Sequence, residues 1–342
     1  MESDMSSGSS TDINPEDLIS DWYLPESGAL DGFIYPNGRS IKKIERLHPI
    51  AQRLLEKCKE ACQDPSRIEF NFQEENGRLF RGHKIMSVEG PMFQLRRLPT
   101  AIPPLSDLGL PLGIQEIILH DDLRKGGLVI IAGETGQGKS TTCAAAIKAR
   151  LEKFSNFCLT IEDPPEMPLH GRHKGGRCIQ TEAISGKFPE AIRGALRAYP
   201  TMAGNILYIG ETRDSETASE ALKIATNGHL VFTTIHASDV ISGIKRFISL
   251  ATSSKDISEE AIKSIFADGL RMMLHQRLID RPATASAHAS KQLEVHFLLS
   301  KSGATPVAHM IRKSSIEGLS TPMDTQRRTL EIQGVSGLMK IW

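Results

Sequence analysis

The chain has 342 residues, enough for two domains, because a single hydrophobic core stops growing at about 250–300 residues. Lys and Arg together number 41, as do Asp and Glu, so strong nucleic-acid binding is not expected. The 5 cysteines are scattered and form no zinc-ligand pattern, which is typical of reduced thiols in the cytoplasm. No apolar run approaches the roughly 18 residues of a membrane span, so no integral membrane segment is expected.

The N-terminal part is expected to begin with a disordered segment and continue as a small α+β domain over residues 13–98. Residues 1–12 are small and polar, and Asn14-Pro15 is typical of a helix start. A helix is expected at 50–63, with one apolar face: Ile50, Leu54, Leu55, Cys58 and Cys62. Alternating apolar and polar residues predict strands of an antiparallel sheet at 67–72, 79–85 and 92–98.

Residues 99–105 are rich in proline and are expected to form a linker and hinge. From residue 106 to 342 strands and helices alternate, which predicts an α/β domain with a parallel sheet covered on both faces. Strands are expected at 128–132, 157–162, 206–210 and 230–236, and helices at 141–150, 188–199 and 214–226. Asp256 to Glu259 predicts a capping box for a long amphipathic helix that reaches Leu274, and 281–290 predicts a flexible loop.

The stretch from Gly133 to Thr141 fits G-x-x-x-x-G-K-[ST], the phosphate-binding loop. An apolar strand precedes it and a helix follows it, as the motif requires. Lys139 is expected to reach the β- and γ-phosphates of ATP, and the Ser140 hydroxyl to coordinate Mg²⁺. The loop residues expected to bind the nucleotide are Gly133, Thr135, Gly136, Gln137, Gly138, Lys139, Ser140 and Thr141.

Acidic residues follow two of the expected strands. One strand ends in Glu162-Asp163-Pro164-Pro165-Glu166, and another ends in Gly210-Glu211 after four apolar residues. The second pattern is typical of a Walker B strand with glycine at the position of the usual first acid, and Glu211 is expected to hold Mg²⁺ or its water. His236 ends a further apolar strand, where a histidine can face the γ-phosphate.

These motifs, in this order, resemble those of the type II/type IV secretion and type IV pilus ATPases over residues 75–342. The resemblance implies a homohexamer of subunits with a PAS-like N-terminal domain and a RecA-like P-loop ATPase domain, with ATP bound where the two meet. It further implies a cytoplasmic protein at the inner-membrane face, bound to platform proteins of a secretion or pilus machine.

The resemblance also implies roles for individual residues. Glu166 or Glu162 is expected to be the catalytic carboxylate, and His229 and His236 to sense the γ-phosphate. Four arginines are expected to supply charge to the phosphates: Arg81 and Arg96 in the N-terminal domain, and Arg193 and Arg197 on a later helix. Together with Glu211 these complete the expected catalytic and binding set.

Departures from the family pattern suggest the branch. No cysteine follows Cys178, so the four-cysteine zinc motif of the extension and type II secretion ATPases is missing, which favours a DotB-like or PilT-like protein. Residues 200–205 form a longer turn before the Walker B strand, and 308–313 match the pilus-retraction signature only in part. The sequence therefore predicts an ATPase of a Dot/Icm-like or conjugative type IV secretion machine. A pilus-retraction ATPase and a non-hydrolysing nucleotide sensor are the alternatives.

Overall fold

The computed structural model describes residues 19–35, 41–64, 68–183, 188–200, 205–253, 257–281, 290–301, 303 and 305–342. The chain divides into two compact units, Met1–Thr100 and Ala101–Trp342. The predictions for residues 1–12 and for the helix start at Asn14-Pro15 lie outside the described residues. So do residues 201–204 of the longer turn and residues 282–289 of the predicted loop.

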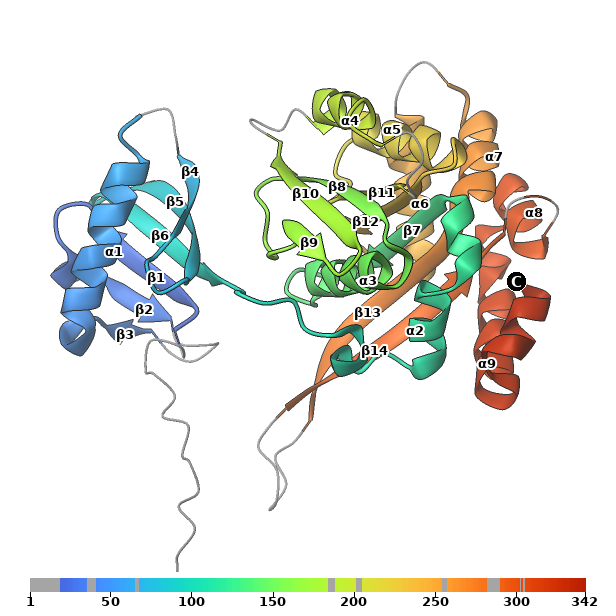
Figure 1. The fold of residues 1–342 in the computed structure, drawn as a ribbon, viewed down its shortest axis with the longest axis horizontal. Helices are drawn as coiled ribbons and strands as arrows, with labels where there is room; N and C mark the ends of the chain where they lie inside the picture. Colours follow the sequence, from blue (N-terminus) through green and yellow to red (C-terminus); the bar gives the residue numbers. More distant parts are fainter. Residues whose placement is uncertain are drawn as a thin grey trace, which may run out of the picture. The chain divides into compact units, whose positions relative to one another are not determined.

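The first unit is an antiparallel sheet with one helix packed on it (Figure 1). Its strand order is β3-β2-β1-β6-β5-β4. The strands are β1 (Asp21–Pro25), β2 (Phe33–Tyr35), β3 (Lys42–Lys43), β4 (Glu69–Gln73), β5 (Leu79–Ser87) and β6 (Gly90–Leu98). Helix α1 (His48–Ala61) buries Ala51, Leu54, Leu55 and Cys58, whereas Ile50 and Cys62 are half-buried. The predicted helix and three predicted strands are therefore present, and β1 to β3 were missed.

The second unit is built on a mixed sheet with the order β14-β13-β7-β12-β11-β8-β10-β9. The strands are β7 (Gly127–Ala132), β8 (Phe157–Glu162), β9 (Gly171–His173), β10 (Gly176–Glu182), β11 (Asn205–Ile209), β12 (Leu230–Ile235), β13 (Leu270–Arg281) and β14 (Ser290–Leu299). The strands from β13 to β10 pair in parallel, while β14 and β9 pair antiparallel at the two edges. The prediction of a parallel sheet is right for the centre and wrong at the edges, where each outer strand forms a hairpin with its neighbour.

Helices cover both faces of this sheet. They are α2 (Leu112–Ile118), α3 (Lys139–Phe154), α4 (Phe188–Leu196), α5 (Ser215–Thr226), α6 (Val240–Thr252), α7 (Glu259–Gly269), α8 (Pro306–Arg312) and α9 (Ser320–Ile341). Short 3₁₀ helices in the two units are η2 (Ala29–Asp31), η3 (Glu45–Leu47), η4 (Leu105–Leu108), η5 (Asp121–Lys125) and η7 (Ile316–Leu319). Among the described residues, no helix is both long enough and apolar enough to cross a membrane.

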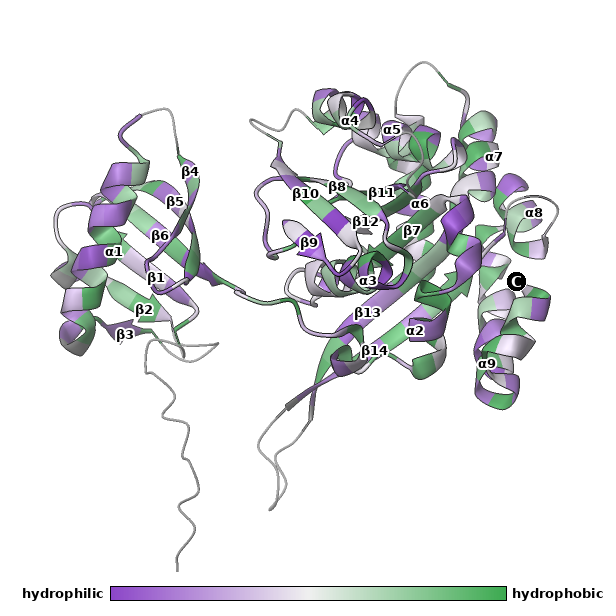
Figure 2. Ribbon diagram, viewed as in Figure 1, coloured by the Kyte–Doolittle hydropathy of each residue, from purple (hydrophilic) through white to green (hydrophobic). Residues whose placement is uncertain are grey.

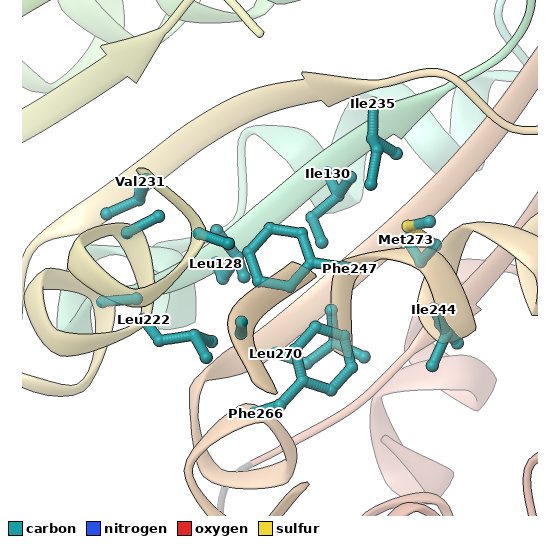
Figure 3. Packing of buried hydrophobic residues seen from close by; sticks show 14 of the residues in the cluster. Leu128, Ile130, Leu222, Val231, Ile235, Ile244, Phe247, Phe266, Leu270 and Met273 are labelled. Carbon is teal, nitrogen blue, oxygen red and sulfur yellow. The ribbon is translucent and has the colours of Figure 1, made fainter. Parts of the chain in front are cut away.

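Strand β7 is buried on both faces, and its side chains alternate between two cores. Leu128 and Ile130 pack with the helices α5 to α7, and Val129 and Ile131 pack with α2 and α3. Figure 2 shows β7 as a continuous apolar strand inside the unit. Figure 3 shows the first core, in which the rings of Phe247 and Phe266 lie 5.4 Å apart. Burial on both faces explains why this strand is an unbroken apolar run.

The prediction of a long helix that reaches Leu274 is wrong in its last part. Helix α7 ends at Gly269, and Leu270 begins strand β13. Met272 and Leu274 point into one core, while Leu270 and Met273 point into the other. An apolar run that is buried on both faces of a sheet cannot be told from a buried helix by its periodicity. The cap of α7 is Ser258, whose hydroxyl accepts a hydrogen bond from the Ala261 N–H; Asp256 lies outside the described residues.

The proline-rich segment differs from the prediction in its second half. Ile102 and Leu105 are buried in the core formed with α2 and α3. The Lys148 ammonium, on α3, donates to the Ile102 carbonyl over 3.3 Å. These residues therefore belong to the second unit, although the sequence assigns them to a linker.

Candidate active site

Four neighbouring parallel strands bring the predicted site residues to one edge of the sheet. Strands β7, β12, β11 and β8 are paired in that order, with Ala132 opposite Ile235 and Ile209 opposite Ile161. The segments that follow these strands therefore start side by side. They carry the loop from Gly133, then His236, Glu211 and Glu166, while Glu162 is the last residue of β8 itself. The carboxyl edge of a parallel sheet is where α/β proteins place their ligand sites.

The loop 133–141 joins β7 to α3 as the motif requires. Lys139 begins α3, and its ammonium donates to the Glu134 carbonyl over 2.7 Å, so the side chain lies back across the loop. Partial burial lowers the pKa of Lys139, while the charges of Glu211 and Glu166 act in the opposite direction. A lysine ammonium at the start of a helix is suited to bind phosphate oxygens, because the helix N-terminus also attracts anions.

The loop contacts the acidic segment after β8 directly. The Ser140 hydroxyl donates to Glu166 Oε2 over 2.7 Å. The nearby Thr141 hydroxyl lies 3.9 Å from the sulfur of Met167, the next residue of that segment. The structure therefore joins the residue predicted to hold Mg²⁺ to one of the two predicted catalytic carboxylates.

Glu162, the other predicted carboxylate, is the last residue of β8 and only 3% exposed. Burial raises its pKa to about 7, although the hydrogen bond from Gln180 acts in the opposite direction. The Gln180 amide donates to Glu162 Oε1 over 2.9 Å and to the Met167 carbonyl over 2.8 Å. Gln180 thus links the buried carboxylate to the segment that carries Glu166.

Glu211 follows β11 and is partly exposed. It pairs with Arg213, whose Nε and terminal nitrogen lie 2.9 and 2.7 Å from Glu211 Oε2. This hydrogen bond raises the pKa of Arg213. The turn is fixed to β12 at two points: the Thr234 hydroxyl donates to the Gly210 carbonyl over 2.6 Å, and the Thr212 N–H donates to the Thr234 carbonyl over 2.9 Å.

The two predicted histidines lie at opposite ends of the central strand β12. His236 follows β12, and its Nε2 is 2.8 Å from the Thr135 hydroxyl of the loop. His229 precedes β12 and stacks on Tyr199, with ring centroids 5.2 Å apart. Partial burial lowers the pKa of His229. Within one chain, therefore, only His236 reaches the loop.

Within one chain, the four predicted arginines contact described residues outside the loop 133–141. Arg193 lies 4.0 Å from Glu220 on α5, and Arg197 is exposed in the turn after α4. Arg81 and Arg96 belong to the first unit, where they are cross-strand neighbours on β5 and β6. Arg96 pairs with Asp21 over 2.9 Å, and Arg81 lies 3.9 Å from Glu69. Their predicted role at the phosphates stays a prediction.

Several residues at this edge were not found from the sequence. Gln180, Arg213, Thr234 and Gln276 all contact site residues or the loop. Gln180 and Gln276 stand in strands that the sequence did not predict, and a single glutamine in such a strand gives no signal. Arg213 and Thr234 lie within the quoted motifs, but their partners depend on strand pairing.

The donor set suits Mg²⁺ only together with a nucleotide. No group of three or more His, Cys, Asp or Glu side chains in the described residues could hold a metal ion. Mg²⁺ in nucleotide sites takes one or two protein oxygens, with phosphate oxygens and water completing its six ligands. The Ser140 hydroxyl and the carboxylate of Glu166 or Glu211 could supply those protein oxygens.

Comparison with known proteins agrees with this fold. The model of the "Type II/IV secretion system protein" family matches residues 59–329, so the chain belongs to this family of secretion and pilus proteins. It is 30% identical to the type IV pilus retraction ATPase PilT of Pseudomonas aeruginosa, over 75% of this chain and 72% of that protein.

Solved structures show the same fold. The pilus retraction motor PilT with bound ADP aligns with a TM-score of 0.73 and 26% identity, over 95% of this chain and 93% of that chain. The ATPase DotB of Legionella pneumophila aligns with a TM-score of 0.63 and 23% identity, over 92% of this chain and 83% of that one. The second similarity is evidence of a shared fold alone.

Proposed function

We propose that this chain is an ATPase that binds Mg·ATP at the loop 133–141 and hydrolyses it to drive a membrane-bound pilus or secretion machine. The observation that carries the proposal is the 2.7 Å hydrogen bond between Ser140 and Glu166. It joins the phosphate-binding loop to a carboxylate, and hydrolysis needs a metal, a phosphate cradle and a carboxylate that orients water. The ADP bound to the related PilT structure supports a nucleotide as the ligand.

Each residue of the site has a separate role in the proposed hydrolysis. Lys139 would bind the β- and γ-phosphates, and Ser140 and Glu211 would hold the metal ion. Glu166 is suited to orient the attacking water, because Glu162 is buried and its pKa of about 7 leaves it largely protonated in mildly acidic solution. His236 contacts the loop through Thr135 and is suited to respond to the γ-phosphate.

The related proteins favour pilus retraction as the particular process. PilT is similar to this chain in both sequence and structure. The similarity to DotB is one of fold alone, and the Dot/Icm-like alternative has no further support. The Dot/Icm-like or conjugative role predicted from the sequence is thus no better supported than retraction. Retraction becomes the first candidate, and type IV secretion the second.

A homohexamer with PAS-like and RecA-like domains remains part of the proposal. Arg193 and Arg197 are exposed, and His229 lies at the opposite end of β12 from the loop. In a ring, such residues could reach the site of a neighbouring subunit, which would account for roles that one chain does not explain. The ring would act in the cytoplasm, against platform proteins at the inner-membrane face.

Phosphate release from Mg·ATP, measured against subunit concentration, tests the proposal. The activity per subunit of the wild type should rise with concentration, because the site is completed between subunits, and Glu211→Gln should lose it at every concentration. Glu152→Gln is the matched control, since Glu152 lies on α3 and pairs with Lys174. If the wild type binds nucleotide but releases no phosphate at any concentration, the sensor alternative replaces the ATPase.

A further inference from the structure

The phosphate-binding loop is fixed to strand β13 at its middle residue, Gln137. The Gln276 amide donates to the Gln137 carbonyl over 2.6 Å. The Leu278 N–H donates to Gln137 Oε1, also over 2.6 Å. Both the main chain and the side chain of Gln137 therefore turn toward β13 and not into the space above the loop.

The loop also meets β13 at its first residue. A Cβ atom on Gly133 would lie 2.6 Å from the Gln276 carbonyl oxygen, which is closer than real Cβ contacts come. Only glycine fits this approach of two backbones. The same strand residue, Gln276, is thus in contact with the start and the middle of the loop.

Gln276 is a polar side chain that is buried, with one of its polar atoms unpaired in the part of the chain that the structure describes. It is 1% exposed, and its Oε1 has no hydrogen-bond partner among the described residues. A buried acceptor without a partner costs free energy, and an apolar side chain of similar size would avoid that cost. We therefore attribute the presence of glutamine at this position to its amide N–H donor, which is hydrogen-bonded to the Gln137 carbonyl.

Holding this carbonyl fixes the next N–H group. In a planar trans peptide the C=O of one residue and the N–H of the next point in opposite directions. Since the Gln137 carbonyl points to β13, the Gly138 N–H points away from β13, toward the open side of the loop. Successive N–H groups turned to one side form the concavity that binds phosphate.

We propose that Gln276 and Gln137 form a clamp that sets the peptide between Gln137 and Gly138, and that Gln276 is a positioning residue for the phosphates of the bound nucleotide. This inference rests on the proposed function, because it assumes that the loop binds a nucleotide. The clamp acts on the phosphates and not on the base. By linkage, bound phosphate in turn stabilises the contact between the loop and β13.

Methionine substitutions remove each half of the clamp with little change in side-chain length. The variants are Gln276→Met and Gln137→Met. The control is Gln115→Met, because Gln115 on α2 makes a similar 2.7 Å bond to the Leu110 carbonyl, away from the loop. Thermal unfolding without ligand establishes that each variant is folded.

Binding is measured with a fluorescent ADP analogue and with inorganic pyrophosphate as its competitor. Gln276→Met should weaken both ligands by the same factor, about five- to tenfold, as expected for the loss of one hydrogen bond that positions an amide. In turnover, its KM for ATP should rise by a similar factor while kcat changes less than about twofold. Gln115→Met should match the wild type in all three measurements.

Hydrogen exchange gives a second test, which observes the contact between the loop and β13 directly. ADP should slow the exchange of the Leu278 N–H, and Gln137→Met should remove that protection. The clamp is overturned if a folded Gln276→Met binds both ligands as the wild type does, or if ADP leaves the Leu278 N–H unchanged. If the wild type binds neither ligand, the proposed function itself fails and the clamp with it.

Discussion

Gly210, after strand β11, lies against the side chain of Glu162 at the end of β8: a Cβ atom on Gly210 would come 3.3 Å from Glu162 Cγ. The Gly210 N–H also donates to the Ile161 carbonyl over 2.9 Å, which holds the two strand ends together. This contact gives a physical reason for glycine at the position of the usual first acid of a Walker B strand. An acid there would stand beside a second, buried carboxylate.

The first prediction follows from this contact. Gly210→Asp should lower the free energy of unfolding by about 2 kcal/mol or more, because it crowds Glu162 and adds a like charge next to it. Gly194→Asp is the control, since a Cβ at Gly194 meets nothing within 4 Å. Chemical denaturation of both variants measures the difference. Equal losses in the two variants would contradict the crowding.

The second prediction concerns pH. The pKa of Glu162 rises from 4.5 in its ordinary state to about 7 in the fold. Between these values the folded chain binds a proton that the unfolded chain has released, so the contribution of Glu162 to stability falls as the pH rises, by up to roughly 3 kcal/mol. Compared with the wild type, Glu162→Gln should therefore gain stability between about pH 5 and pH 8. Denaturation at both pH values measures this gain, and a constant difference would argue against the raised pKa.

The third prediction separates the two candidate carboxylates. Glu166→Gln should lower kcat about 100-fold or more and leave ADP affinity within about threefold, because a water-orienting group acts mainly in the transition state. Glu162→Gln should lower kcat less at neutral pH, since Glu162 is already partly protonated there. Single-turnover phosphate release measures both. The reverse order of effects would assign the catalytic role to Glu162.

The fourth prediction separates the two histidines. His236→Ala should lower kcat, because it removes the contact with Thr135 in the loop. His229→Ala should leave ADP binding to single subunits unchanged and cost about 1 kcal/mol of stability, through the lost stacking on Tyr199. Calorimetric titration of ADP at low subunit concentration measures the binding. Weaker ADP binding by dilute His229→Ala would contradict its position at the far end of β12.

The sequence predicted the part of the fold that local pattern controls. The strands at 128–132 and 157–162, and the loop between β7 and α3, are found where the motif and the apolar runs indicate. These are segments in which the hydrophobic pattern and the turn residues agree. The residues after these strands also reach one edge, as parallel pairing requires.

The parts that were missed depend on pairing between distant residues. The first residues of strand β13 were taken for the end of a helix, because Leu270, Met272, Met273 and Leu274 are buried in two cores on opposite faces of the sheet and the run has no clear period of its own. The contacts of Gln276 with the loop and of Gln180 with Glu162 join residues far apart in the chain. Such contacts leave no local pattern in the chain, and local pattern is the only signal that a single sequence provides.

The central claim is that the loop 133–141 is where this protein hydrolyses ATP. The most direct measurement is steady-state phosphate release from Mg·ATP by the wild type and by Lys139→Ala, with Lys153→Ala as control because Lys153 lies near the end of the same helix and contacts the Leu119 carbonyl. The account predicts turnover in the wild type and in the control, and background release in Lys139→Ala at every concentration. Phosphate release by Lys139→Ala at the rate of the wild type would contradict it.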